Sequence, residues 1–209
     1  MPTLTALAPD PRQPGYRLVE VDRGRFASLP AEALQGLELT LGAVLSGRTL
    51  ARLQELADVE AAYRAAARAL AARGRAQRDL RRRLIQKQHP PQAVDTALER
   101  LAAQGLIDDR RFGLAYAARR AASGRGPARI LMDLLAQGVE RGLAEAVVHE
   151  ALASEGHDPA RALRAVAARR AAQLADVPAV ARTRRLLAYL ARRGYRGPEV
   201  RAVVAEVCR

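Results

Sequence analysis

The pattern of apolar and polar positions divides the chain into two kinds of segment. From residue 58 onward, apolar residues recur at spacings of three and four, which places them on one face of an α-helix. Before residue 58, Tyr16–Val21 and Phe26–Leu29 are rich in β-branched, aromatic and aliphatic residues, with Gly24 in the polar connection between them. Two such runs predict a β-hairpin. We therefore expect a small N-terminal element, residues 1–57, that contains a hairpin and short helices, the latter at 31–35 and 50–57.

An internal repeat organises the helical region. Five positions of the first copy have counterparts after a shift of 50 residues, and again after a further shift of 56. In chain order the three sets are Leu80, Leu84, His89, Val94 and Leu98; Ile130, Leu134, Val139, Ala144 and Val148; Leu186, Leu190, Tyr195, Val200 and Val204. The break inside each set also recurs, as Lys87-Gln88, Gln137-Gly138 and Arg193-Gly194. A shared register and a shared break are typical of repeat proteins.

Each copy reads as three helices, because prolines stand where helices could begin and glycines where they could end. The expected helices are 58–72, 76–87, 91–104, 109–122, 127–137, 143–154, 159–175, 178–193 and 198–208. The fold class is therefore mainly α, with tandem three-helix repeats forming an elongated array behind a small N-terminal β-hairpin-containing element. The first, second and third repeats are placed at 58–107, 108–154 and 155–209.

Charge is distributed unevenly over these segments. The chain has 34 Arg and one Lys, a bias that a GC-rich genome would produce and that carries no function by itself. However, residues 1–57 have no net charge, and the three repeats have net charges of +5, +1 and +7. A basic body behind a neutral head favours nucleic acid or an acidic protein surface as the partner. The alternative is a solvated helical surface with excess arginine.

Several classes of protein are excluded or disfavoured. The longest run without a charged residue is nine, too short for the roughly 20 residues that span a bilayer. The single cysteine, Cys208, excludes an internal disulfide framework and a cysteine-based zinc site. The first residues lack the apolar stretch of a signal peptide. We therefore expect a cytoplasmic protein with no membrane partner.

Candidate chemistry is sparse, and we expect no catalytic residue, no metal and no cofactor. The three histidines form no pair at the spacing of metal ligands, and no serine lies in a Gly-x-Ser-x-Gly motif. Asp108-Asp109 stands at a predicted helix start, where capping is favoured over a hydrolytic role. The amides of Gly124–Pro127 could hold a phosphate or carboxylate, but a flexible joint is the favoured interpretation.

The basic residues are better patterned. At 100° per residue, Arg75, Arg78 and Arg82 lie opposite the apolar stripe that contains Leu80 and Leu84. In the third repeat, Arg184 is the counterpart of Arg78, and Arg193 is that of Lys87. The candidate residues for binding DNA or a protein partner are Arg75, Arg78, Arg81, Arg82, Lys87, Arg120, Arg125, Arg184, Arg193 and Arg196.

Three segments carry a resemblance to a known family. Gly105–Phe112 (GLIDDRRF), followed by Tyr116 and Arg120, resembles the signature of the RecX family. Gly124–Ile130 (GRGPARI) and Arg73–Leu84 (RGRAQRDLRRRL) are similar to the family's neighbouring segments. The order and spacing of the segments are more specific than any one of them. The chain departs from the family pattern at Ala76, Gln88 and Asp133, which concern local helix ends.

The resemblance implies a regulator and not an enzyme. RecX-like proteins are tandem three-helix repeats that modulate the RecA recombinase, usually as inhibitors. They lie in the groove of the RecA–single-stranded DNA filament and interfere with ATP hydrolysis, strand exchange and filament growth. By resemblance the partners are the RecA filament and single-stranded DNA, with double-stranded DNA as a further candidate, and the chain acts as a monomer. The alternative function is a stand-alone DNA-binding protein that acts through its basic helical surface.

Overall fold

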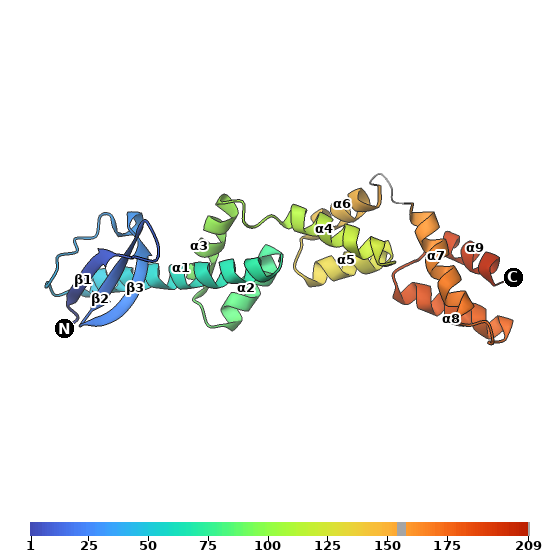
Figure 1. Cartoon of the computed structure of the whole chain (residues 1–209), viewed down its shortest axis with the longest axis horizontal. Coiled ribbons are helices and arrows are strands. Elements are labelled where there is room, and N and C mark those ends of the chain that lie inside the picture. The colour runs from blue at the N-terminus through green and yellow to red at the C-terminus, as the bar shows by residue number, and fades with distance from the viewer. Residues whose placement is uncertain (154–157, 209) are drawn as a thin grey trace. The chain divides into compact units, whose positions relative to one another are not determined.

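The computed structural model describes residues 1–153 and 158–208. The chain forms two compact units (Figure 1). The first comprises Met1–Gly74 and Leu80–Ile107, and the second comprises Arg75–Asp79 and Asp108–Arg209. Helices dominate the described residues, and the only sheet among them has three strands near the N-terminus, so the predicted fold class is confirmed.

The sheet consists of β1 (Leu4–Pro9), β2 (Tyr16–Val21) and β3 (Gly24–Pro30), antiparallel and in that order. The predicted hairpin is β2–β3. Its turn residues, Asp22 and Arg23, have φ angles of 51° and 62°. Positive values at both positions are typical of two-residue hairpin turns whose twist matches that of the flanking strands. The first strand was not predicted from the sequence, because its alanines and terminal proline have low β-propensity.

Helix α1 runs without interruption from Gly47 to Ala72. It replaces the two expected helices at 50–57 and 58–72, so the expected break between them is wrong. The reason is visible in the sequence, since no glycine or proline lies between residues 48 and 72. Ser46 caps the helix by accepting a hydrogen bond from the Thr49 amide at 3.0 Å. Leu53 packs with the sheet, whereas Ala62 and Ala66 pack with α2 and α3. The N-terminal element and the first repeat therefore share one helix.

The three-helix organisation of the repeats is confirmed (Figure 1). The helices after α1 are α2 (Gln77–Gln86), α3 (Pro91–Ala103), α4 (Asp109–Ala122), α5 (Pro127–Ala136), α6 (Arg141–Ala153), α7 (Pro159–Ala172), α8 (Ala179–Arg192) and α9 (Pro198–Val207), and Glu32–Leu34 forms a short 3₁₀ helix. All repeat positions are buried except His89, which is half-buried. The end of the expected sixth helix, at residue 154, lies outside the described residues. No helix in the described part of the chain is long and apolar enough to cross a membrane.

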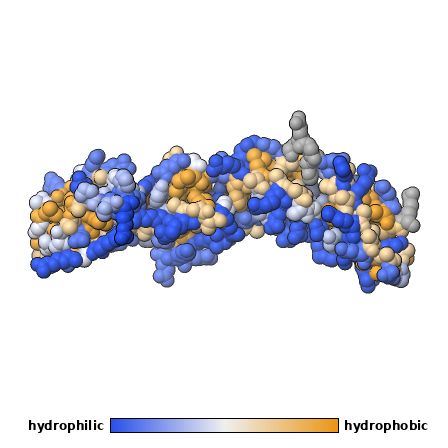
Figure 2. All heavy atoms as spheres, in the orientation of Figure 1, coloured by the Kyte–Doolittle hydropathy of each residue, from blue (hydrophilic) through white to orange (hydrophobic). Residues whose placement is uncertain are grey.

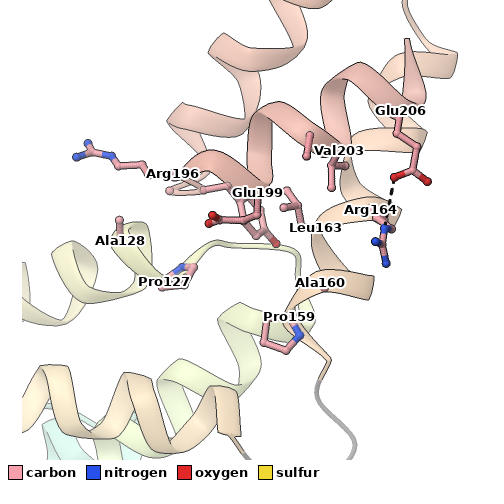
Figure 3. Close-up of a pocket in the computed structure, with 13 residues that line it drawn as sticks. Pro127, Ala128, Pro159, Ala160, Leu163, Arg164, Arg196, Glu199, Val203 and Glu206 are labelled. Atoms are coloured by element: carbon pink, nitrogen blue, oxygen red, sulfur yellow. Dashed lines mark ion pairs between the residues drawn. The ribbon is translucent and has the colours of Figure 1, made fainter. Parts of the chain in front are cut away.

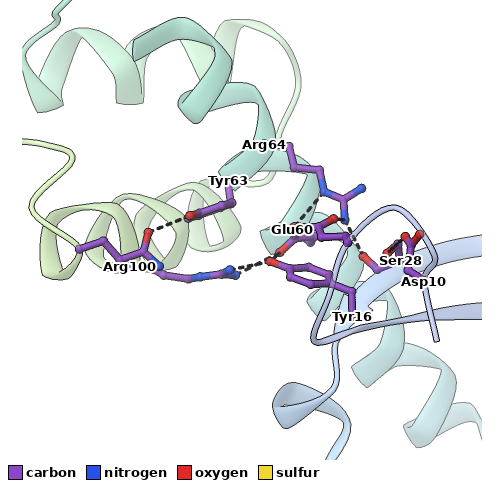
Figure 4. Close-up of polar contacts among 9 residues, drawn as sticks. Asp10, Tyr16, Ser28, Glu60, Tyr63, Arg64 and Arg100 are labelled. Atoms are coloured by element: carbon purple, nitrogen blue, oxygen red, sulfur yellow. Dashed lines mark hydrogen bonds and ion pairs between the residues drawn. The ribbon is translucent and has the colours of Figure 1, made fainter. Parts of the chain in front are cut away.

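A buried carboxylate ties the sheet to the helices of the first unit (Figure 4). Glu60, on α1, is 3% exposed. It accepts hydrogen bonds from Arg64 Nε at 2.8 Å, Arg100 Nη1 at 3.1 Å and the Tyr16 hydroxyl at 3.5 Å. Arg64 continues to the backbone carbonyl of Ser28 on β3 at 3.1 Å. The network thus joins β2, β3, α1 and α3.

The helix-capping prediction for Asp108 is confirmed. Its side chain accepts a hydrogen bond from the Arg111 amide at 2.8 Å, at the start of α4. The neighbouring Asp109 accepts from the Gln77 amide at 2.8 Å, at the start of α2. Both carboxylates therefore satisfy amides that the helices themselves leave without a partner.

Replacing Asp108 with alanine should lower the free energy of unfolding by about 1 kcal/mol, because the Arg111 amide loses its acceptor. Urea denaturation of the full chain measures this. Asp108→Asn is the control, since asparagine is also a good cap and should cost only a few tenths of that amount. Equal stability of the alanine variant and the wild type would contradict the capping role.

Candidate interaction surfaces

The structure divides the candidate basic residues into exposed and half-buried side chains. Six are exposed: Arg78, Arg81, Arg82, Lys87, Arg184 and Arg196. Four are half-buried: Arg75, Arg120, Arg125 and Arg193. Figure 2 shows hydrophilic side chains over much of the visible face of the helical region, with apolar patches between them. The exposed candidates belong to the first and third repeats, the two with the highest net charge.

Arg75 does not share the helical face of Arg78 and Arg82. It precedes α2, which begins at Gln77 and not at residue 76 as expected. Its Nη1 donates to Asp79 Oδ2 at 2.9 Å, and both side chains are largely buried. A helical projection does not apply before the helix starts, so the grouping of Arg75 with the other two is corrected.

Two further candidates, Arg81 and Arg120, make specific contacts. Arg81 binds Asp95 with two nitrogens, at 2.6 and 3.0 Å, although both side chains are nearly half exposed. The hydrogen bond from Arg81 lowers the pKa of the Asp95 carboxyl. Arg120 Nε donates to the Tyr116 hydroxyl at 2.9 Å, and its guanidinium lies 5.0 Å from the ring centre. These contacts orient the side chains in the absence of a partner.

Arg193 takes part in the contact between the second and third repeats. Its Nη1 donates to the carbonyls of Ser123 and Gly124, at 3.3 and 3.1 Å, at the end of α4. Its guanidinium also lies 4.9 Å from the ring centre of Tyr189. The sequence gives no sign of this role, because the partners are about seventy residues away.

The segment Gly124–Pro127 is a close backbone contact and not an anion site. The amides of Gly126 and Ala128 donate to the carbonyls of Arg193 and Gly194, at 2.7 and 3.3 Å. A Cβ at Gly126 would lie 2.5 Å from the Gly194 carbonyl carbon. The Gly126 amide is therefore occupied by the third repeat, and the Gly124 and Arg125 amides donate to the carbonyls of Ala121 and Arg120 on α4. Pro127 stands in the first turn of α5 as expected, but the segment before it packs against the backbone of the third repeat, which the expected flexible joint did not include.

The same arrangement occurs at the start of α2. A Cβ at Gly138 would lie 2.7 Å from Arg78 Cβ and 3.3 Å from the Asp79 amide nitrogen. In both cases the glycine at the break of one repeat packs against the beginning of the second helix of the preceding repeat. The break of the first repeat has no preceding repeat, and it carries Gln88 at a φ of 66°. Gln88 is exposed, so its side chain has the space that a Cβ at Gly138 or Gly194 would lack.

An apolar pocket of about 460 Å³ lies beside this joint (Figure 3). Pro127, Leu163, Tyr195 and Val203 contribute to its walls, and the Arg164–Glu206 ion pair, at 3.7 Å, lies at its edge. In the described part of the chain, no three His, Cys, Asp or Glu side chains are grouped so that they could hold a metal ion. The apolar and charged side chains of this pocket suit the binding of a partner by shape and charge.

The fold and these surfaces define a tandem three-helix repeat protein whose exposed candidate residues lie on its first and third repeats. The family model described as "RecX, first three-helix domain" matches residues 62–101, and "RecX, second three-helix domain" matches residues 108–148. The chain is 38% identical over 147 residues to "Regulatory protein RecX" of Halorhodospira halophila, covering 70% of this chain and 88% of that protein. It therefore belongs to the RecX family.

Other relatives agree. "Regulatory protein RecX" of Pseudomonas savastanoi is 37% identical over 128 residues, covering 60% of this chain and 78% of that protein. Among solved structures, a crystal structure of regulatory protein RecX has a TM-score of 0.74 and 18% identity, and covers 99% of this chain and 98% of that chain. RecX from Lactobacillus salivarius has a TM-score of 0.62 and 16% identity, covering 72% of this chain and 96% of that chain. At these identities the structures support the fold alone.

Proposed function

We propose that this chain is a regulator of the RecA recombinase that binds the RecA–single-stranded DNA filament and inhibits its ATP hydrolysis, strand exchange and growth. The observation that carries the proposal is its 38% identity to a protein named regulatory protein RecX, over most of that protein's length. The exposed basic residues of the first and third repeats support this proposal, because a protein filament assembled on DNA presents phosphates and acidic side chains. The chain would act by binding, as a monomer, and without catalysing a reaction.

The proposed contacts follow from the chemistry of arginine. Its guanidinium keeps its charge at all physiological pH values and binds carboxylate or phosphate with two parallel hydrogen bonds. Arg78, near the start of α2, and Arg184, on α8, occupy equivalent places in their repeats and are exposed. Two such positions on separate repeats would contact the filament at separated points. Binding should weaken with salt, because phosphate contacts release counterions.

The double variant Arg78→Gln/Arg184→Gln should bind the filament about tenfold more weakly, at roughly 0.7 kcal/mol for each lost contact. Co-sedimentation with RecA filaments assembled on single-stranded DNA with a non-hydrolysable ATP analogue measures this. The matched control is Arg110→Gln/Arg141→Gln, which removes the same charge from exposed positions of the second repeat. Equal losses in the two variants would refute the assignment of these residues, because they would show a response to net charge alone.

The stand-alone DNA-binding function is the second candidate, since the same exposed arginines would bind naked DNA. It differs in what it predicts for the recombinase. A DNA-binding protein without a dedicated partner inhibits RecA only when it covers the DNA. A regulator inhibits at amounts far below coverage.

A further inference from the structure

An arginine-lined groove of about 690 Å³ lies between α5 of the second repeat and α8 of the third. Its lining includes Arg125 and Arg129 from one repeat and Arg192 and Arg196 from the other. The backbone contact between Gly126 and Gly194 fixes these two pairs relative to each other. The groove is therefore formed by two repeats, and neither Arg78 nor Arg184 lines it.

The charge of the groove is strongly positive. Arg129 Nε pairs with Asp133 Oδ1 at 2.9 Å, which neutralises one of the four guanidinium groups. In Figure 3 the side chain of Arg196 extends past Ala128 and points away from Glu199, so this carboxylate does not neutralise it. Arg192 and Arg196 are both exposed, and Arg125 is half-buried. An anionic occupant would relieve the repulsion among these charges.

The rest of the lining is apolar. Ala128, Leu131, Met132 and Ala191 lie among the arginines, and the Met132 side chain is 61% exposed. A flexible methionine on a surface adapts to different apolar partners. Among the described residues, the lining contains no aromatic side chain on which a nucleic-acid base could stack. Phosphates alone would leave the apolar part of the groove uncovered.

We propose that this groove binds an acidic protein segment that carries an apolar side chain, with the carboxylates on the arginines and the apolar side chain on Leu131 and Met132. The proposal deepens the regulatory function and rests on it for the identity of the protein that supplies the segment. Binding of such a segment is itself a property of the groove. It can therefore be measured without RecA, so the two proposals fail separately.

The test uses the full-length chain and a fluorescein-labelled ten-residue peptide rich in Glu and Asp with one central Phe. Fluorescence anisotropy should show saturable binding, which Arg192→Gln/Arg196→Gln weakens by about tenfold. Arg141→Gln/Arg161→Gln removes the same charge from exposed positions outside the groove and should change the affinity by less than about twofold. Met132→Ser should weaken binding of the Phe peptide. It should leave unchanged the affinity for a peptide with Ser in place of Phe.

Three outcomes would overturn the proposal. Equal losses in the groove and control variants would show that only net charge matters. Equal affinity for the Phe and Ser peptides would remove the role of the apolar lining. An oligothymidylate of the same charge that binds more tightly than the Phe peptide, and loses its affinity in Arg192→Gln/Arg196→Gln, would assign the groove to nucleic acid. Circular dichroism of each variant confirms that the helices are intact.

Discussion

Replacing Gly194 with alanine is expected to lower the free energy of unfolding by about 2–4 kcal/mol and to release the third repeat from the second. Gly194 has a φ of 88°, which disfavours any residue with a side chain. In addition, a Cβ there would lie 2.5 Å from Arg129 Cβ and would meet the Arg129 amide nitrogen even more closely. Because backbone cannot move aside as a flexible side chain can, the contact must open.

Gly105→Ala is the matched control for this variant. Gly105 also has a positive φ, 68°, but an added Cβ would meet no atom within 4 Å. Gly105→Ala should therefore lower the free energy of unfolding only by the cost of placing a side chain at a positive φ, about 1–2 kcal/mol. Hydrogen exchange gives the second readout: the Gly126 and Ala128 amides, which donate across the joint, should lose protection in Gly194→Ala and keep it in Gly105→Ala. Equal protection in both variants would contradict the joint.

Replacing Glu60 with alanine is expected to cost about 2–4 kcal/mol, because Arg64 and Arg100 would lose the carboxylate that they share. These arginine side chains are 34% and 30% exposed, so water recovers part of the loss, and the expected value lies below that of a fully buried pair. The Tyr16 hydroxyl, whose pKa burial raises further, is protonated at neutral pH and would lose Glu60 as its acceptor. Guanidinium denaturation measures the change.

The control lies on the same helix. Glu55 pairs with Arg52 at 2.8 Å, but both side chains are more than half exposed. Glu55→Ala should therefore change the free energy of unfolding by less than about 1 kcal/mol. If the two alanine variants were equally stable, the buried network would not be what holds the sheet to the helices of the first unit.

The repeats could be predicted because their information is local. Apolar residues at helical spacing, prolines at helix starts and a recurring break identify each repeat, and the predicted positions are buried, with His89 half-buried. The N-terminal element was harder to predict from the sequence. Its β1 strand depends on pairing with β2, as between Leu4 and Val21, and not on its own composition. Burial of Glu60 was also unpredictable, since its partners lie 44 and 40 residues away.

For the candidate surfaces, too, local features could be predicted from the sequence and tertiary contacts could not. The family could be recognised from contiguous motifs such as Gly105–Phe112, and the comparisons confirm it. Which arginines face solvent could not be read from spacing, because it depends on tertiary contacts. Arg193 has a helical position equivalent to Lys87, yet it binds the end of α4. Arg129 and Arg192, which line the groove, were not among the candidates, and only the docking of two repeats brings them together.

Regulation of a recombinase filament can be tested by titrating RecA's single-stranded-DNA-dependent ATPase with the full-length protein. We expect inhibition when the chain is present at a small fraction of the RecA concentration and covers only a small part of the DNA. Inhibition that rises only in proportion to DNA coverage, measured in parallel on DNA without RecA, would contradict it and favour the stand-alone DNA-binding function.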